Sequence, residues 1–322
     1  MPNRYASLPK EQAIRLRRNW RKGVFVLPSL ITTANIFCGF YSIMESAAGS
    51  QAFVLKDIPL AGQCFDRAAV SIGFAALFDL LDGRIARMTN TTSEFGIELD
   101  SIADIVSFGV APAVLAYLWG YGHIPQINKL AWAASFLFLI CGALRLARYN
   151  VQARHPNPNL PPKNPKEKKA FVGMPIPAGA YLIAAIVHFS PTPLSSQDGF
   201  IIPVTENLTI PGRGFATGLL VLMGCLALLM VSTFRYSSLN KIGTGKQSPR
   251  FVILGFVALG FCIWFYSTWS LLALSLLYTS HGVVSKLWSL VKPRRTMASD
   301  VDATTRNDPA ASDDGIQPQR TP

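Results

Sequence analysis

The chain has 322 residues, 50% of them hydrophobic, and its mean hydropathy is +0.30. This composition excludes an ordinary pair of soluble domains and favours lipid as the solvent. The length therefore indicates a number of membrane helices rather than a number of domains. The formal charge of +12 would suit nucleic acid or an anionic membrane surface. Because Lys and Arg concentrate in loops between apolar stretches, we expect the protein to bind a membrane surface and not nucleic acid.

The chain begins with a basic arm, residues 1–26, which is polar for too long to be a cleavable signal peptide. A bilayer span needs about 20 mostly apolar residues. The segments that approach this length are 27–46, 66–87, 97–121, 130–149, 173–190, 214–234, 250–265 and 267–288. The sequence thus predicts an all-α integral membrane protein with about eight transmembrane helices over residues 27–290. Residues 291–322 are low in aromatic and branched side chains and are expected to be a disordered cytoplasmic tail.

The loops alternate in their content of Lys and Arg. Seven basic residues lie in the N-terminal arm, seven in 145–173 and four in 235–250, whereas the intervening loops carry one or two each. Cytoplasmic loops are the ones enriched in Lys and Arg. The alternation therefore predicts a multi-pass protein of the cytoplasmic (inner) membrane with both termini in the cytoplasm.

Four aspartates interrupt the second and third predicted spans: Asp79, Asp82, Asp100 and Asp104. A charge at the bilayer centre costs roughly 2.5–3.5 kcal/mol, so these side chains must face water, a cation or both. Each pair shares one face of its helix at about 100° per residue. Two adjacent antiparallel helices can therefore bring the four carboxylates together at the cytoplasmic side.

Carboxylates at such short distances from one another repel each other unless a cation neutralises them. Oxygen ligands without nearby His or Cys favour hard ions such as Mg²⁺ or Mn²⁺, and we expect two divalent ions, a familiar means of stabilising charge in phosphoryl transfer. A metal-free buried ion network is disfavoured because the acids lack enough basic partners. Gly83 and Ala86 leave room for close helix packing or for a flat ligand. Arg87 suits phosphate oxygens, and Gly96 would permit the turn into the third span.

Residues 79–104 read DLLDGRIARMTNTTSEFGIELDSIAD, which is DxxDGxxAR, eight residues, then GxxxDxxxD. This pattern is the complete signature of the CDP-alcohol phosphatidyltransferase family, which the chain resembles over the first six spans. The resemblance implies a six-helix membrane core, often in a homodimer. It implies that Asp79, Asp82 and Asp100 bind the divalent metals. It also implies that Asp104 assists them and acts as general base on the acceptor hydroxyl.

The same resemblance assigns the donor substrate. The residues that would bind the cytidine and diphosphate of the CDP-lipid are Gly83, Ala86, Arg87 and Gly96. The segments LITTANIFCGFYSI (30–43), ALRLARYNV (143–151), FVGMPIPAGA (171–180) and VSTFRY (231–236) resemble bacterial membrane-bound members of the family that use L-serine. The implied reaction transfers the phosphatidyl group of CDP-diacylglycerol to the serine hydroxyl, by attack on the lipid-side phosphorus, and gives phosphatidylserine and CMP.

The serine carboxylate needs a cation near the metals. Arg145 and Arg148 are candidates for binding it or the lipid phosphate, and anchoring at the membrane surface explains them equally well. Asn35 lies in the middle of the first span, where an amide needs a partner, and it is the third candidate for contacting acceptor or phosphate.

Other functions remain open at this stage. The same chemistry could use glycerol 3-phosphate or inositol as acceptor. A membrane prenyltransferase also uses aspartates with Mg²⁺, but it separates two acidic motifs widely, whereas all four aspartates here fall within 26 residues. A transporter with an intramembrane carboxylate ion site is the alternative of another class.

Overall fold

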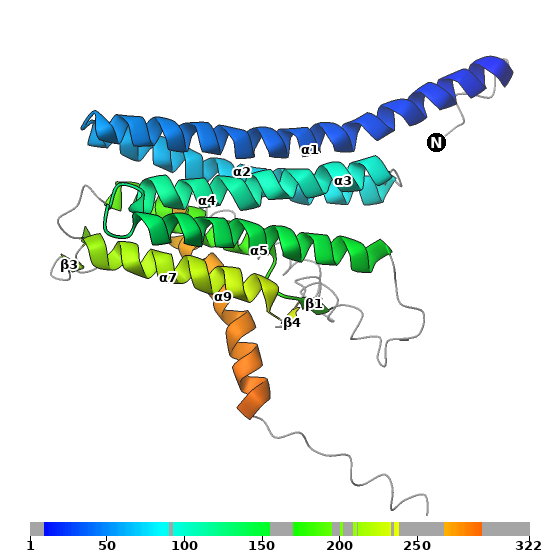
Figure 1. Ribbon diagram of the computed structural model, residues 1–322. Helices are drawn as coiled ribbons and strands as arrows, with labels where there is room; N and C mark the ends of the chain where they lie inside the picture. Colours follow the sequence, from blue (N-terminus) through cyan, green and yellow to red (C-terminus); the bar gives the residue numbers. More distant parts are fainter. Residues whose placement is uncertain are drawn as a thin grey trace, which may run out of the picture.

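The computed structural model describes residues 10–89, 93–154, 170–194, 200–201, 209–210, 212–232, 235–237 and 267–291. These residues form a bundle of long helices, drawn in Figure 1. The helices in chain order are α1 (Lys10–Val54), α2 (Ile58–Thr89), α3 (Glu94–Asp104), the π-helix η1 (Ile105–Val110), α4 (Ala111–Ala116), the π-helix η2 (Tyr117–Tyr121), α5 (Asn128–Arg154), α6 (Ile176–Phe189), α7 (Gly212–Val231) and α9 (Ser267–Val291). The predicted helical architecture is confirmed.

Two helices extend well beyond the predicted spans. α1 begins at Lys10 rather than at residue 27, and α2 covers Ile58–Thr89 rather than 66–87. The segment from Lys10 to Lys22 is rich in Leu, Arg, Lys, Gln and Glu, which favour helix wherever the chain is, so the helix continues past the apolar stretch. From Lys10 onward, the basic arm is therefore the first part of α1.

Three helical segments of the described chain are long and apolar enough to cross a membrane: Glu94–Tyr121, Asn128–Gln152 and Gly214–Val231. α6 is a shorter apolar helix. The predicted span 250–265 lies outside the described residues, so the count of eight spans stays a prediction. In α2 the apolar stretch contains Asp79, Asp82 and Arg84, which lower its apolar character.

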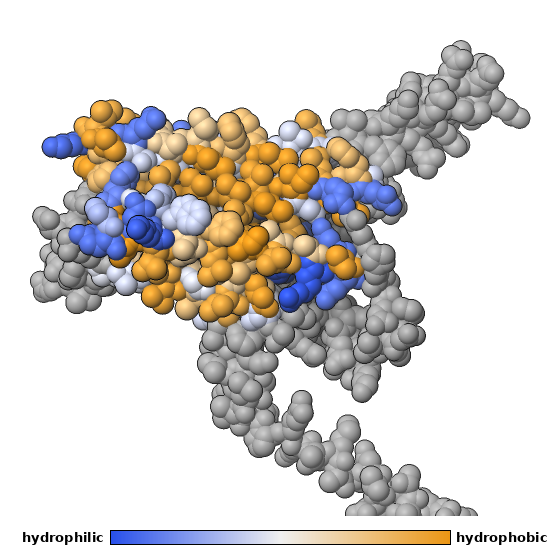
Figure 2. All heavy atoms as spheres, viewed as in Figure 1, coloured by the Kyte–Doolittle hydropathy of each residue, from blue (hydrophilic) through white to orange (hydrophobic). Residues whose placement is uncertain are grey.

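The surface of the bundle fits a bilayer. Figure 2 shows hydrophobic residues across the middle of the visible face and hydrophilic residues toward its two ends. Large apolar side chains are exposed on three helices: Phe37 and Phe40 on α1, Phe74 on α2, and Trp132 and Phe136 on α5. Exposed apolar surface of this extent is unfavourable in water and favourable against lipid tails.

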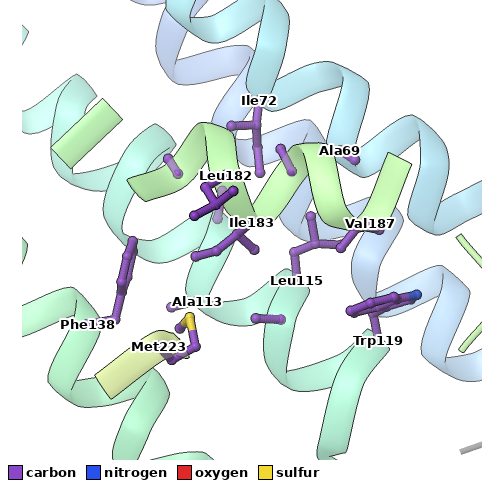
Figure 3. Close-up of a cluster of buried hydrophobic side chains, with 14 of the residues drawn as sticks. Ala69, Ile72, Ala113, Leu115, Trp119, Phe138, Leu182, Ile183, Val187 and Met223 are labelled. Atoms are coloured by element: carbon purple, nitrogen blue, oxygen red, sulfur yellow. The ribbon is translucent and has the colours of Figure 1, made fainter. Parts of the chain in front are cut away.

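α6 lies inside the bundle and holds its core together. Leu182, Ile183 and Val187 of α6 are buried with Ile72 of α2 and Leu115 of α4, as Figure 3 shows. Nearly every side chain of α6 is buried or half-buried, which agrees with the apolar character of this helix on all sides.

The predicted span 97–121 is one helical rod that contains two π-helices. In η1 the N–H of Ala111 donates to the carbonyl of Val106, five residues earlier, and in η2 the N–H of Gly122 donates to Tyr117. Pro112, the second residue after η1, has no N–H to donate, which favours a change of hydrogen-bond register here. The extent of the span was predicted, and its π-helices were not.

Four short strands were not predicted. β1 (Ala170–Val172) pairs antiparallel with β4 (Arg235–Ser237), and β2 (Phe200–Ile201) pairs with β3 (Thr209–Ile210). After β1 the chain turns at Gly173, with φ of 82°, where an added Cβ would collide with the carbonyl oxygen of Met230. The predicted span 173–190 therefore begins as a turn, and α6 starts only at Ile176.

Candidate functional site

The aspartates of the sequence motif converge where α2 ends and α3 begins. Asp79, Asp82 and Asp100 each offer a carboxylate oxygen, and these three oxygens lie within 4.8 Å of one another. Asp82 is only 5% exposed. The predicted convergence of two neighbouring helices on one acidic cluster is therefore confirmed for these three side chains.

Asp104 lies one helical turn beyond Asp100 and outside that three-oxygen group. It is close enough to Asp79, Asp82 and Asp100 to interact with each electrostatically. Its Oδ1 atom is buried and has no hydrogen-bond partner within the described part of the chain. This position separates Asp104 from the tight cluster while leaving it beside the cluster.

The acidic cluster fits a hard divalent cation. Mg²⁺ binds carboxylate oxygens at about 2.0–2.1 Å and Ca²⁺ at about 2.3–2.6 Å, so oxygens on opposite sides of one ion lie about 4–5 Å apart. The three aspartates match this spacing without His or Cys. Asp100 Oδ1, like Asp104 Oδ1, is buried without a hydrogen-bond partner. Uncompensated carboxylates this close are unfavourable unless a cation joins them.

α1 supports the cluster from the side. Thr32 donates a hydrogen bond of 2.9 Å from Oγ1 to Asp82 Oδ2, and this bond is buried. Ser107 of η1 donates to the backbone carbonyl of Asn35 at 2.9 Å. Gly39 permits this approach, because an added Cβ would lie 2.7 Å from the Cα of Ser107. α1 is thus held closely against the rod that carries Asp100 and Asp104.

Asn35 itself is fully buried, and neither its amide nitrogen nor its amide oxygen has a hydrogen-bond partner. The sequence singled out this residue because an amide among apolar side chains needs a partner. Among the residues that the structure describes, no protein group supplies one, so the Asn35 amide is available to a ligand.

The structure separates the two candidate arginines. Arg145 is half-buried, its Nε is buried without a partner, and it interacts electrostatically with Asp104. Arg148 is exposed. Of the two, the structure brings Arg145 toward the acidic cluster, whereas the exposure of Arg148 agrees with the anchoring interpretation.

The remaining motif residues belong to the same helices. Gly83 is half-buried directly after Asp82, and the side chains of Ala86 and Arg87 lie outside the described residues. Gly96 is in the first turn of α3, where its N–H donates to the Oγ of the N-cap Ser93 at 3.0 Å. Its backbone is not left-handed. The expectation that Gly96 makes the turn was wrong, because Ser93 begins the helix by capping it.

Sequence reasoning missed four residues around the site. Tyr181 of α6 is close enough to Asp79, and Tyr278 of α9 close enough to Arg145, for electrostatic interaction. Asn150 of α5 donates to Ser101 of α3 at 2.7 Å. Thr32, the fourth, is three positions before Asn35 on a helix, and that spacing was the one available signal. The tyrosines approach through tertiary packing and leave no signal in the motif.

The helical bundle with membrane-spanning helices and a buried acidic cluster defines a class: membrane proteins whose clustered carboxylates fit a divalent cation. The model of the CDP-alcohol phosphatidyltransferase family matches residues 25–210, and the chain belongs to this family. It is 34% identical over 273 residues to the CDP-diacylglycerol–serine O-phosphatidyltransferase of Helicobacter pylori J99, covering 84% of this chain and 94% of that protein.

Two further relatives bear the same name. The protein of Methanocaldococcus jannaschii is 45% identical over 112 residues, covering 35% of this chain and 46% of the relative. The protein of Saccharomyces cerevisiae is 39% identical over 159 residues, covering 49% of this chain and 52% of the relative. Similarity to the named enzyme therefore extends across bacteria, archaea and yeast.

Proposed function

We propose that this protein is a CDP-diacylglycerol–serine O-phosphatidyltransferase, which transfers the phosphatidyl group of CDP-diacylglycerol to L-serine. The observation that carries the proposal is the convergence of the signature aspartates Asp79, Asp82 and Asp100 inside the bundle. The near full-length relative named for this activity supports serine as the acceptor.

Asp79, Asp82 and Asp100 would hold the divalent cations, Mg²⁺ or Mn²⁺, with Asp104 as an additional ligand. Two bound ions would supply the positive charge that steadies the diphosphate and the departing CMP. Gly83, Ala86, Arg87 and Gly96 would bind the nucleotide part of the CDP-lipid. The small residues of this set leave the backbone accessible, and Arg87 matches phosphate oxygens in charge.

Asp104 is the proposed general base. The serine hydroxyl gives its proton to the Asp104 carboxylate as its oxygen bonds to the lipid-side phosphorus, and the bond from that phosphorus to CMP breaks. The buried Oδ1 without a partner is suited to accept this proton. Asn35, Arg145 and Arg148 are the proposed contacts to the acceptor or to phosphate, and the burial of Asn35 and Arg145 next to the cluster favours these two.

The proposed setting is the cytoplasmic membrane. Eight spans would place both termini and the site on the cytoplasmic side, with a six-helix core and a homodimer as in the family. The division would be a basic region 1–26, a catalytic region 27–290 and a tail 291–322. The alternation of Lys and Arg between loops supports this orientation.

The test uses the purified full-length chain with CDP-diacylglycerol and Mn²⁺ or Mg²⁺. L-serine, glycerol 3-phosphate and inositol are offered separately, and CMP release is measured. We expect CMP release with L-serine and a dependence on the divalent ion. Release with another alcohol but not with serine would contradict the acceptor assignment. Cation uptake into sealed vesicles without any CMP release would instead favour the transporter.

Replacing Asp104 with Asn tests the base. This change keeps the size of the side chain and removes its ability to take a proton, so we expect CMP release to fall by about 10²–10⁴-fold. Binding of CDP, measured by titration, should be largely retained. Full turnover in Asp104→Asn would remove Asp104 from this role.

A further inference from the structure

α1 makes polar contacts with both helices that supply the acidic cluster, and these contacts follow one another along α1. The side chain of Thr32 donates its buried hydrogen bond of 2.9 Å to Asp82 Oδ2 on α2. About one turn further along α1, the backbone carbonyl of Asn35 accepts the hydrogen bond of 2.9 Å from Ser107 Oγ on η1. α1 is therefore a common reference for α2 and for the rod formed by α3 and η1.

The contact between α1 and η1 is tight. Ser107 and Asn35 are both fully buried. Gly39 of α1 faces Ser107, and an added Cβ at Gly39 would lie 2.7 Å from the Cα of Ser107. Only a residue without a side chain lets the two backbones approach this closely. The hydrogen bond and the glycine together hold η1 against α1.

The residue that makes this contact lies one turn from the proposed base. Asp104 is the last residue of α3, and Ser107 is the third residue of η1, which follows directly. Residues three positions apart are neighbours on one side of a helical rod, so a bond that holds Ser107 also limits the rotation of Asp104 about the rod axis. Asp104 Oδ1 has no hydrogen-bond partner among the described residues, so no bond of its own orients this oxygen.

We infer that Ser107 is a positioning residue for the proposed general base, Asp104. Its hydrogen bond to the Asn35 carbonyl fixes the rotation of the rod about its axis. The Asp104 carboxylate thereby keeps a constant direction relative to Asp82, which Thr32 holds from the same helix. This inference rests on the proposed function, and it gives Ser107 no contact with either substrate.

Ser107→Ala removes the hydroxyl from the contact between α1 and η1. We expect the kcat for CMP release to fall on the order of tenfold, since a misplacement of a catalytic group by about 1 Å can cost about a hundredfold. The KM values for L-serine and CDP-diacylglycerol should stay within about twofold, because only the step in which Asp104 takes the proton is slowed. If Ser107→Ala does not fold, Ser107→Cys takes its place with the same expectation, because a thiol fills the space and is a weaker donor.

The chain offers a matched control for this hydrogen bond. Ser71 of α2 is buried, and its Oγ donates to the carbonyl of Cys38 on α1 at 2.7 Å. The bond is of the same kind, from a serine hydroxyl to a carbonyl of α1. α2 also has the direct bond between Thr32 and Asp82 at the cluster itself. Ser71→Ala should therefore lower the thermal midpoint about as much as Ser107→Ala and leave kcat within about twofold.

Gly39→Ala tests the same contact from the side of α1. The added Cβ forces η1 away from α1 although the hydroxyl of Ser107 is still present, so kcat should fall at least as far as in Ser107→Ala. Gly73→Ala on α2 is the matched control, because an added Cβ at Gly73 has no described neighbour within 4 Å. This variant should leave kcat unchanged.

A double variant separates positioning from general destabilisation. In Asp104→Asn the base is already lost, so adding Ser107→Ala should lower the residual CMP release by less than about twofold. Residues that act through one another show such non-additive effects, whereas independent losses would combine in full.

An unchanged kcat in Ser107→Ala together with a lowered thermal midpoint would overturn the inference. So would equal losses of kcat in Ser107→Ala and Ser71→Ala, or a further tenfold loss in the double variant. A rise confined to the serine KM would also overturn it, because the bond would then act on the acceptor through Asn35. Failure of the proposed function is distinguishable, because the unmodified protein would then release no CMP with serine at all.

Discussion

The two ends of the bundle differ in how completely their buried polar side chains are paired. At the acidic end, Asn35, Asp100, Asp104 and Arg145 account for five of the six buried side-chain atoms that lack a hydrogen-bond partner among the described residues. The sixth is the hydroxyl of Ser42 on α1.

At the other end, polar groups are paired. Tyr117 donates to Asn128 Oδ1 at 2.6 Å, Trp119 donates to the carbonyl of Thr192 at 3.1 Å, and His188 pairs with Asp66. Buried polar atoms without partners are costly, so the location of five of the six at one end indicates that this end is built for ligands. The paired end fastens the helices together.

The largest expected effect comes from breaking the acidic end. Asp100→Asn removes one carboxylate of the three-oxygen cluster at constant size. We expect a loss of activity of at least about a thousandfold, or roughly 4 kcal/mol of transition-state stabilisation. In metal-free detergent the thermal midpoint should stay or rise, because one repelling charge is gone. Removal of divalent ions with a chelator should abolish CMP release in the unmodified protein.

This combination of results distinguishes a functional role of the acidic cluster from a purely structural one. If Asp100→Asn lowered the thermal midpoint sharply and kept its CMP release, the cluster would be structural. Thermal unfolding followed by the fluorescence of the tryptophans, together with CMP release, gives both readings.

A smaller effect is expected at the paired end. His188→Ala removes the contacts to Asp66 and Ser267, and we expect a loss of stability of about 1–3 kcal/mol. Turnover at saturating serine should fall much less than in Asp100→Asn. His281→Ala is the matched control, since His281 is an exposed histidine of α9. A loss of turnover as large as that of Asp100→Asn, with stability unchanged, would assign this end a catalytic role.

The smallest effect concerns pH and His123, in the loop after η2. Burial lowers the pKa of His123, whose ring lies 3.0 Å from Ser50 Oγ and packs on Phe53. As pH falls, the imidazole of His123 therefore becomes protonated at a higher pH in the unfolded chain than in the folded chain. The stability that neutral His123 contributes is complete above its ordinary pKa of about 6.5 and is lost as pH falls through its lower folded-state pKa.

Thermal midpoints at successive pH values from neutral to mildly acidic check this expectation. The unmodified protein should lose slightly more stability on acidification than His123→Gln, which cannot titrate. Equal losses in the two proteins would show that His123 contributes nothing to the pH dependence.

The acidic cluster could be predicted from the sequence because it depends on residues that are close together along the chain. Asp79 and Asp82 share a helix face, Asp100 lies on the next helix, and a short connection makes the two helices neighbours. Regular helix geometry then brings the carboxylates together, as the structure confirms.

The surroundings of the cluster could not be predicted in the same way. Tyr181 and Tyr278 reach the site from α6 and α9 through packing over long sequence distances. The pairing of β1 with β4 joins Phe171 to Tyr236, and no periodicity in either segment indicates it. Helix ends were also misplaced, because hydropathy reports the lipid boundary whereas hydrogen bonding decides where α1 and α2 stop.

The π-helix η1 begins directly after Asp104. Each hydrogen-bonded ring of a π-helix contains one more residue than a ring of an α-helix. Deleting a single residue between Ile105 and Val110 would let the rod close into a regular α-helix. If all six residues instead formed a regular α-helix, the additional residue would turn everything before it, Asp100 and Asp104 included, by about 100° around the axis relative to the packed half that follows. The number of residues in this one turn, as much as their identity, aims the two acids at α2.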